Sequence, residues 1–188
     1  MSIPMQTDKC LILGLGKSAS EARGLGRFIT LGVNDVARFH HTTDILVILD
    51  KPGRFTEERL QFIHATQAKE AWVCYPLFWT PWLPDVGAIH TLKTMKYSSS
   101  GLFYGDQVYH YRTSPFAAMS LAVRMGFQKI GLLGVDLLDD HHMGRLVKDL
   151  DKMFNDFANR VMILNRTKIV NCSPISRLTL QYQDLEEF

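Results

Sequence analysis

Short runs of apolar, β-branched residues recur along the chain, with turn signals and helical patterns between them. The runs cover residues 10–13, 28–33, 45–49, 71–75, 130–135 and 168–172. Apolar positions at helical spacing fill residues 18–26, 57–68, 114–125 and 146–161. Alternation of apolar strands with helices is typical of a parallel sheet covered on both faces. We therefore predict a single Rossmann-like, three-layer α/β domain with a mostly parallel sheet of about six strands.

Residues 76–112 interrupt this alternation. Prolines interleave with aromatic residues at the start of the segment, and Ser98, Ser99, Ser100 and Gly101 form a flexible-looking tract within it. We find no internal repeat and no linker long enough to divide the chain. Residues 1–188 are therefore expected to form one nucleotide-binding domain with an irregular segment at 76–112.

Composition narrows the classes of protein that fit. Of 188 residues, 46% are hydrophobic and 21% charged, which excludes a disordered or fibrous chain. The net charge of +2 gives no strong nucleic-acid signal. No stretch reaches the roughly 20 apolar residues of a membrane span, and the start lacks a signal-peptide pattern. Three cysteines without C-x-x-C spacing indicate reduced thiols, so we expect a cytoplasmic protein, with a homo-oligomer left open.

Small and polar residues follow the predicted strands, where open α/β sheets bind their ligands. Gly14 and Gly16, with Ala19, match the G-x-G-x-x-A dinucleotide fingerprint, although the same pattern also occurs in a plain tight turn. Leu11 stands where a Walker A loop needs glycine, which excludes that motif. The candidate nucleotide-binding residues from the strand ends are Gly14, Gly16, Lys17, Ser18, Asn34, Asp35, Ser173 and Ser176.

Proton-active side chains gather after the fifth predicted strand. Asp136 ends that strand, and Asp139, Asp140, His141 and His142 follow it. A histidine beside a carboxylate suits a general base near neutral pH. A metal site or a solvated polar loop would produce the same pattern, so all three interpretations stay open.

Residues 111–136 resemble the bacterial lipooligosaccharide sialyltransferases and the wider set of proteins with that fold, including the hydroxymethylpterin pyrophosphokinase-like family. Thr113 and Ser114 precede an apolar helix, and a strand ends in Gly-Val-Asp at Asp136, as in those proteins. The first glycine loop, Asn34 and residues 171–178 resemble further family motifs in the same order. Lys17 replaces the proline of the family's first loop, and the segment after Asp136 is shorter than the sialyltransferase lid.

The resemblance implies a Rossmann-like domain that binds a cytidine nucleotide sugar. It implies His142 or His141 as the catalytic base, and Asp136 and Asp140 are both near enough in sequence to orient that imidazole. Thr113 and Ser114 are expected to approach the nucleotide. The expected function is thus a glycosyltransferase-like enzyme with a CMP-sugar type donor and no firmly implied cofactor.

Two other functions fit the same residues. A pyrophosphoryl or nucleotidyl transferase would hold Mg²⁺ through Asp136, Asp139 and Asp140. A non-catalytic nucleotide- or NAD-binding module would use Asp35 on a ribose hydroxyl.

Overall fold

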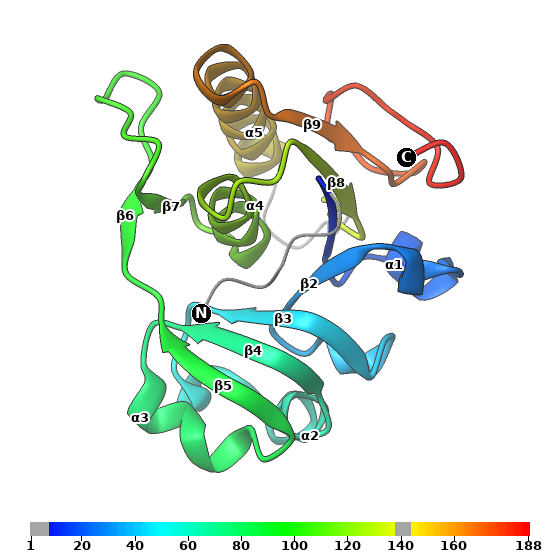
Figure 1. The fold of residues 1–188 in the computed structure, drawn as a ribbon, viewed down its shortest axis with the longest axis vertical. Helices are drawn as coiled ribbons and strands as arrows, with labels where there is room; N and C mark the ends of the chain where they lie inside the picture. Colours follow the sequence, from blue (N-terminus) through cyan, green and yellow to red (C-terminus); the bar gives the residue numbers. More distant parts are fainter. Residues whose placement is uncertain (1–7, 138–143) are drawn as a thin grey trace.

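The computed structural model describes residues 8–137 and 144–188, with side chains described except at 144 and 145. Its main sheet has seven parallel strands in the order β5-β4-β3-β2-β1-β8-β9 (Figure 1). Their bounds are β1 Lys9–Leu13, β2 Ile29–Val33, β3 Thr42–Ile48, β4 Gln67–Val73, β5 Val86–Thr91, β8 Lys129–Leu133 and β9 Lys168–Asn171. The predicted parallel α/β fold is confirmed, and the expectation of about six strands is corrected to seven.

The additional strand comes from the segment 76–112. It forms the edge strand β5 and a small parallel sheet of β6 (Thr94–Lys96) and β7 (Val108–His110). The backbone amide of Leu92 donates to the Val73 carbonyl at 2.8 Å, which carries the pairing of β5 with β4 one residue beyond the strand. The segment is therefore part of the domain and extends the sheet.

Five α-helices surround the sheet in the described part of the chain: α1 Lys17–Glu21, α2 Glu57–His64, α3 Pro76–Trp79, α4 Ser114–Arg124 and α5 Gly144–Asn165. Short 3-10 turns occupy Leu25–Arg27, Val36–Arg38, Pro52–Arg54 and Thr80–Trp82. The expected helix at 18–26 ends early, at Glu21 of α1, because Ala22 is already extended with a ψ of 144°, and Gly24 beyond it has a left-handed φ of 69°. None of these helices is long and apolar enough to cross a membrane.

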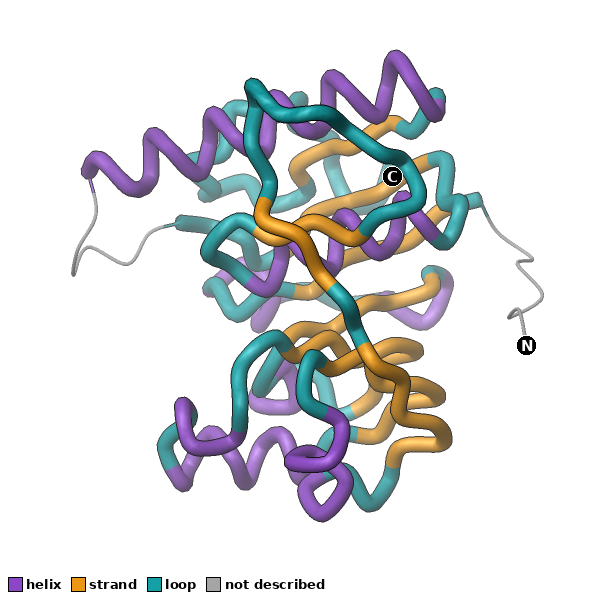
Figure 2. The backbone as a smooth tube through the Cα atoms, turned by 90° about the vertical axis from the view of Figure 1, so that its left-hand side faces the viewer, coloured by secondary structure: helices purple, strands orange, loops and turns teal. Residues whose placement is uncertain are grey.

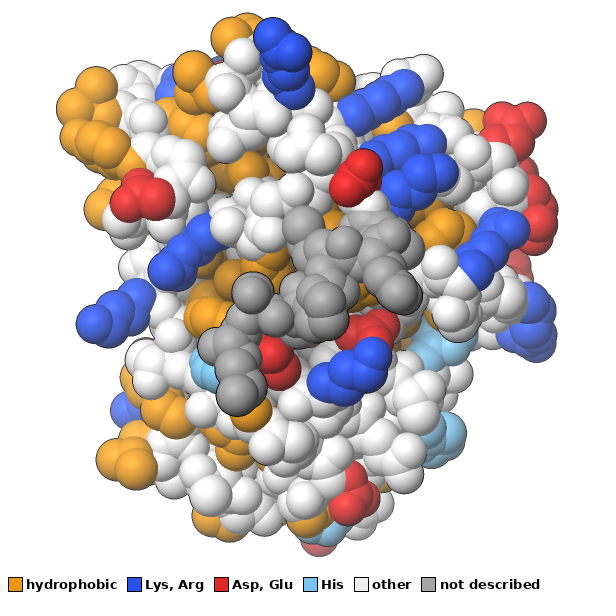
Figure 3. All heavy atoms as spheres, viewed as in Figure 1, with side chains coloured by type: hydrophobic (Ala, Val, Ile, Leu, Met, Phe, Trp, Pro, Cys, Tyr) orange, Lys and Arg blue, Asp and Glu red, His pale blue; other side chains and the backbone are white. Residues whose placement is uncertain are grey.

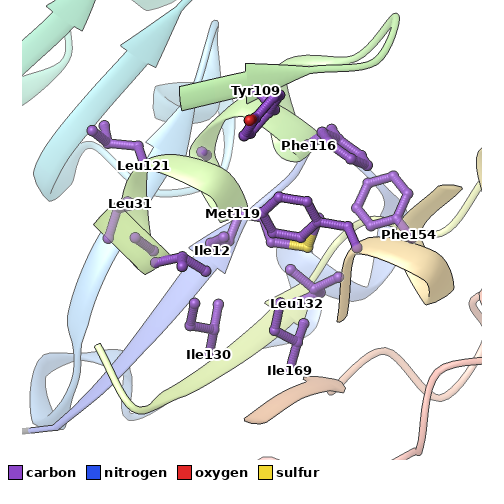
Figure 4. Packing of buried hydrophobic residues seen from close by; sticks show 14 of the residues in the cluster. Ile12, Leu31, Tyr109, Phe116, Met119, Leu121, Ile130, Leu132, Phe154 and Ile169 are labelled. Atoms are coloured by element: carbon purple, nitrogen blue, oxygen red, sulfur yellow. The ribbon is translucent and has the colours of Figure 1, made fainter. Parts of the chain in front are cut away.

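Strand side chains alternate between two hydrophobic cores, one on each face of the sheet. On one face, Ile12 and Leu132 meet Phe116 and Met119 of α4 and Phe154 of α5 (Figure 4). On the other face, residues of β1, β3, β4 and β9 pack on α2, α3 and the C-terminal segment that ends at Phe188. The two cores make the domain three layers deep, as the sequence predicted.

Helix α4 is the central helix of the first core. Thr113 caps its start, because the Thr113 hydroxyl accepts from the Phe116 amide at 3.4 Å, and Pro115 fits the first turn. Gly126 ends it with a φ of 90°. Ala117 and Ala118 are fully buried, so small side chains let α4 approach the strands closely. The predicted apolar helix is confirmed, and nine of its eleven residues are buried.

The strand order creates a crevice. Strands β2 to β5 follow β1 in sequence order on one side of the sheet, whereas β8 and β9 lie on the other side of β1. Ligands of open α/β sheets bind where the order reverses in this way, outside the carboxyl ends of the strands. Here that point lies between β1 and β8.

Candidate functional site

A cavity of about 420 Å³ lies at the carboxyl ends of β1, β2 and β8. Helix α5 begins near the carboxyl ends of the strands and runs back along the sheet toward their amino ends (Figure 2). The cavity is bordered by the turns after these strands and by the first turns of α4 and α5. Its lining residues are Leu15, Gly16, Lys17, Val33, Asn34, Thr113, Pro115, Gly134, Val135, Asp136, Leu137, Val147 and Leu150.

A larger and more open hollow of about 630 Å³ lies at the amino ends of β2 to β5. Two of its three charged lining residues are already paired with each other: the Asp44 carboxylate accepts from the Lys69 ammonium at 2.7 Å, and also from the Thr30 amide at 2.9 Å. Burial works to raise the pKa of Asp44, but these hydrogen bonds outweigh it and hold the pKa below its ordinary value. None of the predicted site residues that the structure describes lines this hollow. We therefore place the candidate site at the carboxyl ends of the strands.

Ser18, Asp136 and Ser173 form a buried polar cluster at the wall of the cavity, and Asp136 is the member that lines it. One Asp136 oxygen accepts from the Ser18 amide at 3.0 Å, and the other accepts from the Ser18 hydroxyl at 2.5 Å. Ser173 accepts from the Gly134 amide at 2.8 Å. The start of α1, where an open fingerprint loop would receive a phosphate, therefore already faces a carboxylate of the protein itself.

Gly14 and Gly16 allow two turns to touch. A Cβ on Gly14 would lie 2.3 Å from the Gly134 carbonyl oxygen, and a Cβ on Gly16 would lie 2.4 Å from an Asp136 carboxylate oxygen. The backbone amide of Gly16 donates to the Gly134 carbonyl at 2.7 Å. Because these glycines have no side chains, the turn after β8 can pack directly against them. Contact of the same glycines with a nucleotide stays a prediction.

Asn34 and Thr113 line the cavity from distant parts of the chain, and the buried Ser114 lies next to them. The Ser114 hydroxyl donates to the Asn34 side-chain oxygen at 3.1 Å, which joins the end of β2 to the start of α4. Asn34 adopts a left-handed φ of 50°, a conformation that asparagine tolerates better than most residues. The structure therefore places three predicted residues at the positive end of an eleven-residue helix.

Other predicted residues lie behind the cavity wall or away from it. Asp35 is fully buried, and one of its oxygens accepts from Arg59 Nε at 3.0 Å and Nη2 at 2.6 Å. The Ser176 hydroxyl donates to the Val135 carbonyl at 2.7 Å and supports the turn after β8. Asp35, Ser173 and Ser176 are not among the lining residues.

The predicted base and its neighbours, Asp139, Asp140, His141 and His142, lie outside the described residues. Leu137 and Val147, the nearest residues on either side of that segment that line the cavity, are described. Among the residues that the structure describes, no group of three or more His, Cys, Asp or Glu side chains is arranged to hold a metal ion.

Sequence reasoning missed part of the cavity wall. Leu137 has a left-handed φ of 54°, and Arg112, which directly precedes Thr113, has one of 58°. Left-handed φ angles in bulky residues concentrate at functional sites, where surrounding structure holds them in place. Val147 and Leu150 enter from the first turns of α5. In the sequence, Val147 and Leu150 belong to the apolar stripe of a core helix, and nothing in that pattern indicated that they line a cavity.

Comparison with known proteins shows the fold. No protein-family model matches the chain, and neither does any curated protein. Solved structures of sialyltransferases are similar to this chain. CstII, an alpha-2,3/8-sialyltransferase solved as a point mutant, has a TM-score of 0.56 at 14% identity over 96% of this chain and 88% of that one.

CstII from Campylobacter jejuni in complex with the substrate analogue CMP-3FNeuAc has a TM-score of 0.53 at 11% identity, over 96% of this chain and 87% of its own. The monofunctional alpha-2,3-sialyltransferase Cst-I from the same organism has a TM-score of 0.55 at 11% identity, over 98% of this chain and 82% of its own. At such identity these structures support the sialyltransferase side of the resemblance at the level of the fold.

Proposed function

We propose that the protein is a glycosyltransferase-like enzyme that uses a CMP-sugar type donor. The observation that carries this proposal is the cavity between the ends of β1 and β8, where Asn34 and Thr113 line the wall and Asn34 is bonded to Ser114 at the start of α4. Support comes from the similar fold of CstII, whose structure with CMP-3FNeuAc contains a CMP-linked substrate analogue. The cavity of about 420 Å³ is within the range of small-molecule sites.

The donor's phosphate would bind at α4 rather than at α1. A phosphate at the start of α1 would approach the Asp136 carboxylate, and two anions in one buried place repel each other. The start of α4 offers a helix dipole, with Thr113 and Ser114 beside it. Lys17 is largely exposed at the rim of the cavity and adds a positive charge there. Because Asn34 Oδ1 accepts from Ser114, the amide nitrogen is the atom of Asn34 that would donate to the nucleotide.

We assign the general base to His142. The acceptor hydroxyl would lose its proton to the imidazole as its oxygen forms the new bond to the sugar. The bond from the sugar to the phosphate breaks at the same centre, and CMP leaves with that electron pair. His142 belongs to the chain between Leu137 and Val147, which both line the cavity. A neutral imidazole is matched to this proton transfer near neutral pH.

Calorimetry with CMP tests the nucleotide site. The variant Asn34→Gly keeps the left-handed backbone without strain and removes the amide, so we expect CMP affinity to fall about tenfold, the value of one hydrogen bond. Arg166→Gly is the matched control, because Arg166 also has a left-handed φ of 59° and lies beyond the end of α5. Binding of NAD, or of ATP with Mg²⁺, in place of CMP would instead favour one of the two alternative functions.

Donor hydrolysis and transfer test the base. His142→Ala should lower the rate by about 10²–10⁴-fold while CMP affinity stays unchanged. His141→Ala is the matched control and should retain most of the activity. Full activity in both variants would show that neither His141 nor His142 is the general base.

A further inference from the structure

The last turn of α5 and the loop between β6 and β7 expose large apolar side chains far from the cavity. We call this set the apolar ridge. Hydrophobic side chains gather over the β6–β7 loop at the upper left of Figure 3. The ridge consists of Leu102 (80% exposed), Tyr104 (50%), Met162 (43%), Ile163 (79%) and Leu164 (62%).

The loop and the helix form one surface because they are bonded to each other. Arg160 of α5 donates to the Gly101 carbonyl at 3.0 Å and also to the carbonyl of Ser99. Four residues further along the loop, a Cβ on Gly105 would lie 3.4 Å from the Asn165 side chain. The loop therefore follows the end of α5 along the stretch that carries Leu102 and Tyr104.

The outward direction of Leu102 and Tyr104 is fixed by the residue between them. The Phe103 ring stacks on Tyr109 at 5.3 Å between centroids and contacts Phe157 at 5.6 Å, inside the domain. The Tyr104 amide donates to the Tyr109 hydroxyl at 2.8 Å. With Phe103 anchored inward, its two neighbours remain exposed to solvent. Their exposure thus follows from how the loop is bonded and packed.

Basic residues border the ridge. Residues 157–183 contain no Asp or Glu, and they include Arg160, Arg166 and Lys168 close to the end of α5. Arg166 is exposed directly after the helix. Of the two carboxylates nearest in sequence to the ridge, Asp156 pairs with Arg160 at 3.2 Å, and Asp106 lies at the end of the loop. An isologous contact through this face would place the basic residues of two copies in one interface, which disfavours self-association.

We propose that the apolar ridge docks on the surface of an anionic lipid membrane. Exposed aliphatic side chains enter the boundary between headgroups and acyl chains, and neighbouring cations bind lipid phosphates. Tyr104 has an apolar ring and a polar hydroxyl, as suits that interface. Ile163 lies 16 residues after Val147 on one helix, so the cavity stands about 24 Å from the docked surface. The cavity would thus be held away from the membrane surface, where it could reach acceptor groups that extend outward from the lipid.

Vesicle flotation with the full chain tests this proposal. The vesicles are phosphatidylcholine alone and phosphatidylcholine with about one-third phosphatidylglycerol. The double variant Ile163→Ser, Leu164→Ser removes apolar surface from exposed positions, so its melting temperature should match that of the parent. Leu77→Ser is the matched control, because Leu77 is an 89% exposed leucine outside the ridge. Light scattering measures the oligomeric state of each form.

The parent and Leu77→Ser should float with the anionic vesicles and not with phosphatidylcholine alone, and salt at about 0.5 M should release them. The double variant should partition at least about tenfold more weakly. Equal flotation of the double variant, or failure of the parent to float, would overturn the proposal. So would a dimer of the parent that the double variant loses, since the ridge would then be a contact between two copies.

Discussion

Asp136→Asn separates a structural carboxylate from a catalytic one. The substitution preserves shape but removes the charge and converts one acceptor oxygen into an NH₂ donor. In the native protein both carboxylate oxygens accept, at 3.0 Å from the Ser18 amide and 2.5 Å from its hydroxyl. The asparagine can satisfy one of these donors, and its own NH₂ group then faces the other.

The expected cost follows from burial. Asp136 is 3% exposed, so water does not replace the lost bond. A hydrogen bond to a charged group contributes about 1.5–3 kcal/mol, and a buried donor left unpaired costs about 1–3 kcal/mol. Because these effects overlap, we expect the free energy of unfolding to fall by about 2–4 kcal/mol. Asp50→Asn, at an exposed aspartate after β3, should change it by less than about 0.5 kcal/mol.

Urea unfolding followed by far-UV circular dichroism measures both variants, with CMP binding determined in parallel. The structural role predicts a lower midpoint for Asp136→Asn at an unchanged slope. If Asp136→Asn unfolds like the parent but loses activity, the carboxylate serves a ligand or a metal and our account of α1 is wrong.

Three further predictions rest on other parts of the fold. Ala118→Leu overpacks α4 against the sheet and should lower the free energy of unfolding by about 1–3 kcal/mol, measured in urea; a neutral result would contradict the close packing. Asp44, whose pKa is lowered by its hydrogen bonds from Lys69 and Thr30 despite burial, stabilises the fold above about pH 4. The stability difference between the parent and Asp44→Asn should therefore shrink as the pH falls through that lowered pKa, and a constant difference in an acid unfolding series would refute this. Burial raises the pKa of Cys172 to about 12 and that of Cys10 well above its usual value, so mass spectrometry should detect their alkylation by iodoacetamide only after unfolding.

The fold was predictable from the sequence because β1, β2, β8 and β9 are buried beyond their first residue and read as nearly continuous apolar runs. Edge strand β5 was missed for the opposite reason. Its side chains are partly exposed on both faces, and it lies among prolines and aromatic residues that indicated a loop. The boundary between α2 and β4 was misplaced as well, because Gln67 and Ala68 continue the helical pattern but pair with β3.

The candidate site was predictable only to the level of the sheet edge. The sequence placed Ser18, Asn34, Asp35 and Asp136 at the carboxyl ends of strands, and the structure confirms that location. The sequence alone did not show whether these side chains bond to a ligand or to other residues of the protein. Asp35 is bonded to Arg59 behind the cavity wall, and Asp136 borders the cavity with its carboxylate already bonded to Ser18, so both carboxylates expected to serve a ligand have partners within the protein.

The contact between Ser18 and Asp136 has a consequence for how the protein folds. The two residues are 118 positions apart, whereas strands β1 to β5 pair with sequential neighbours over short connections. Closing a long loop delays its contacts relative to local ones. We therefore expect β1 to β5 to assemble first and β8 and β9 to dock last. Since the cavity needs the turn after β8, the newly synthesised chain would acquire its ligand site only in that final step.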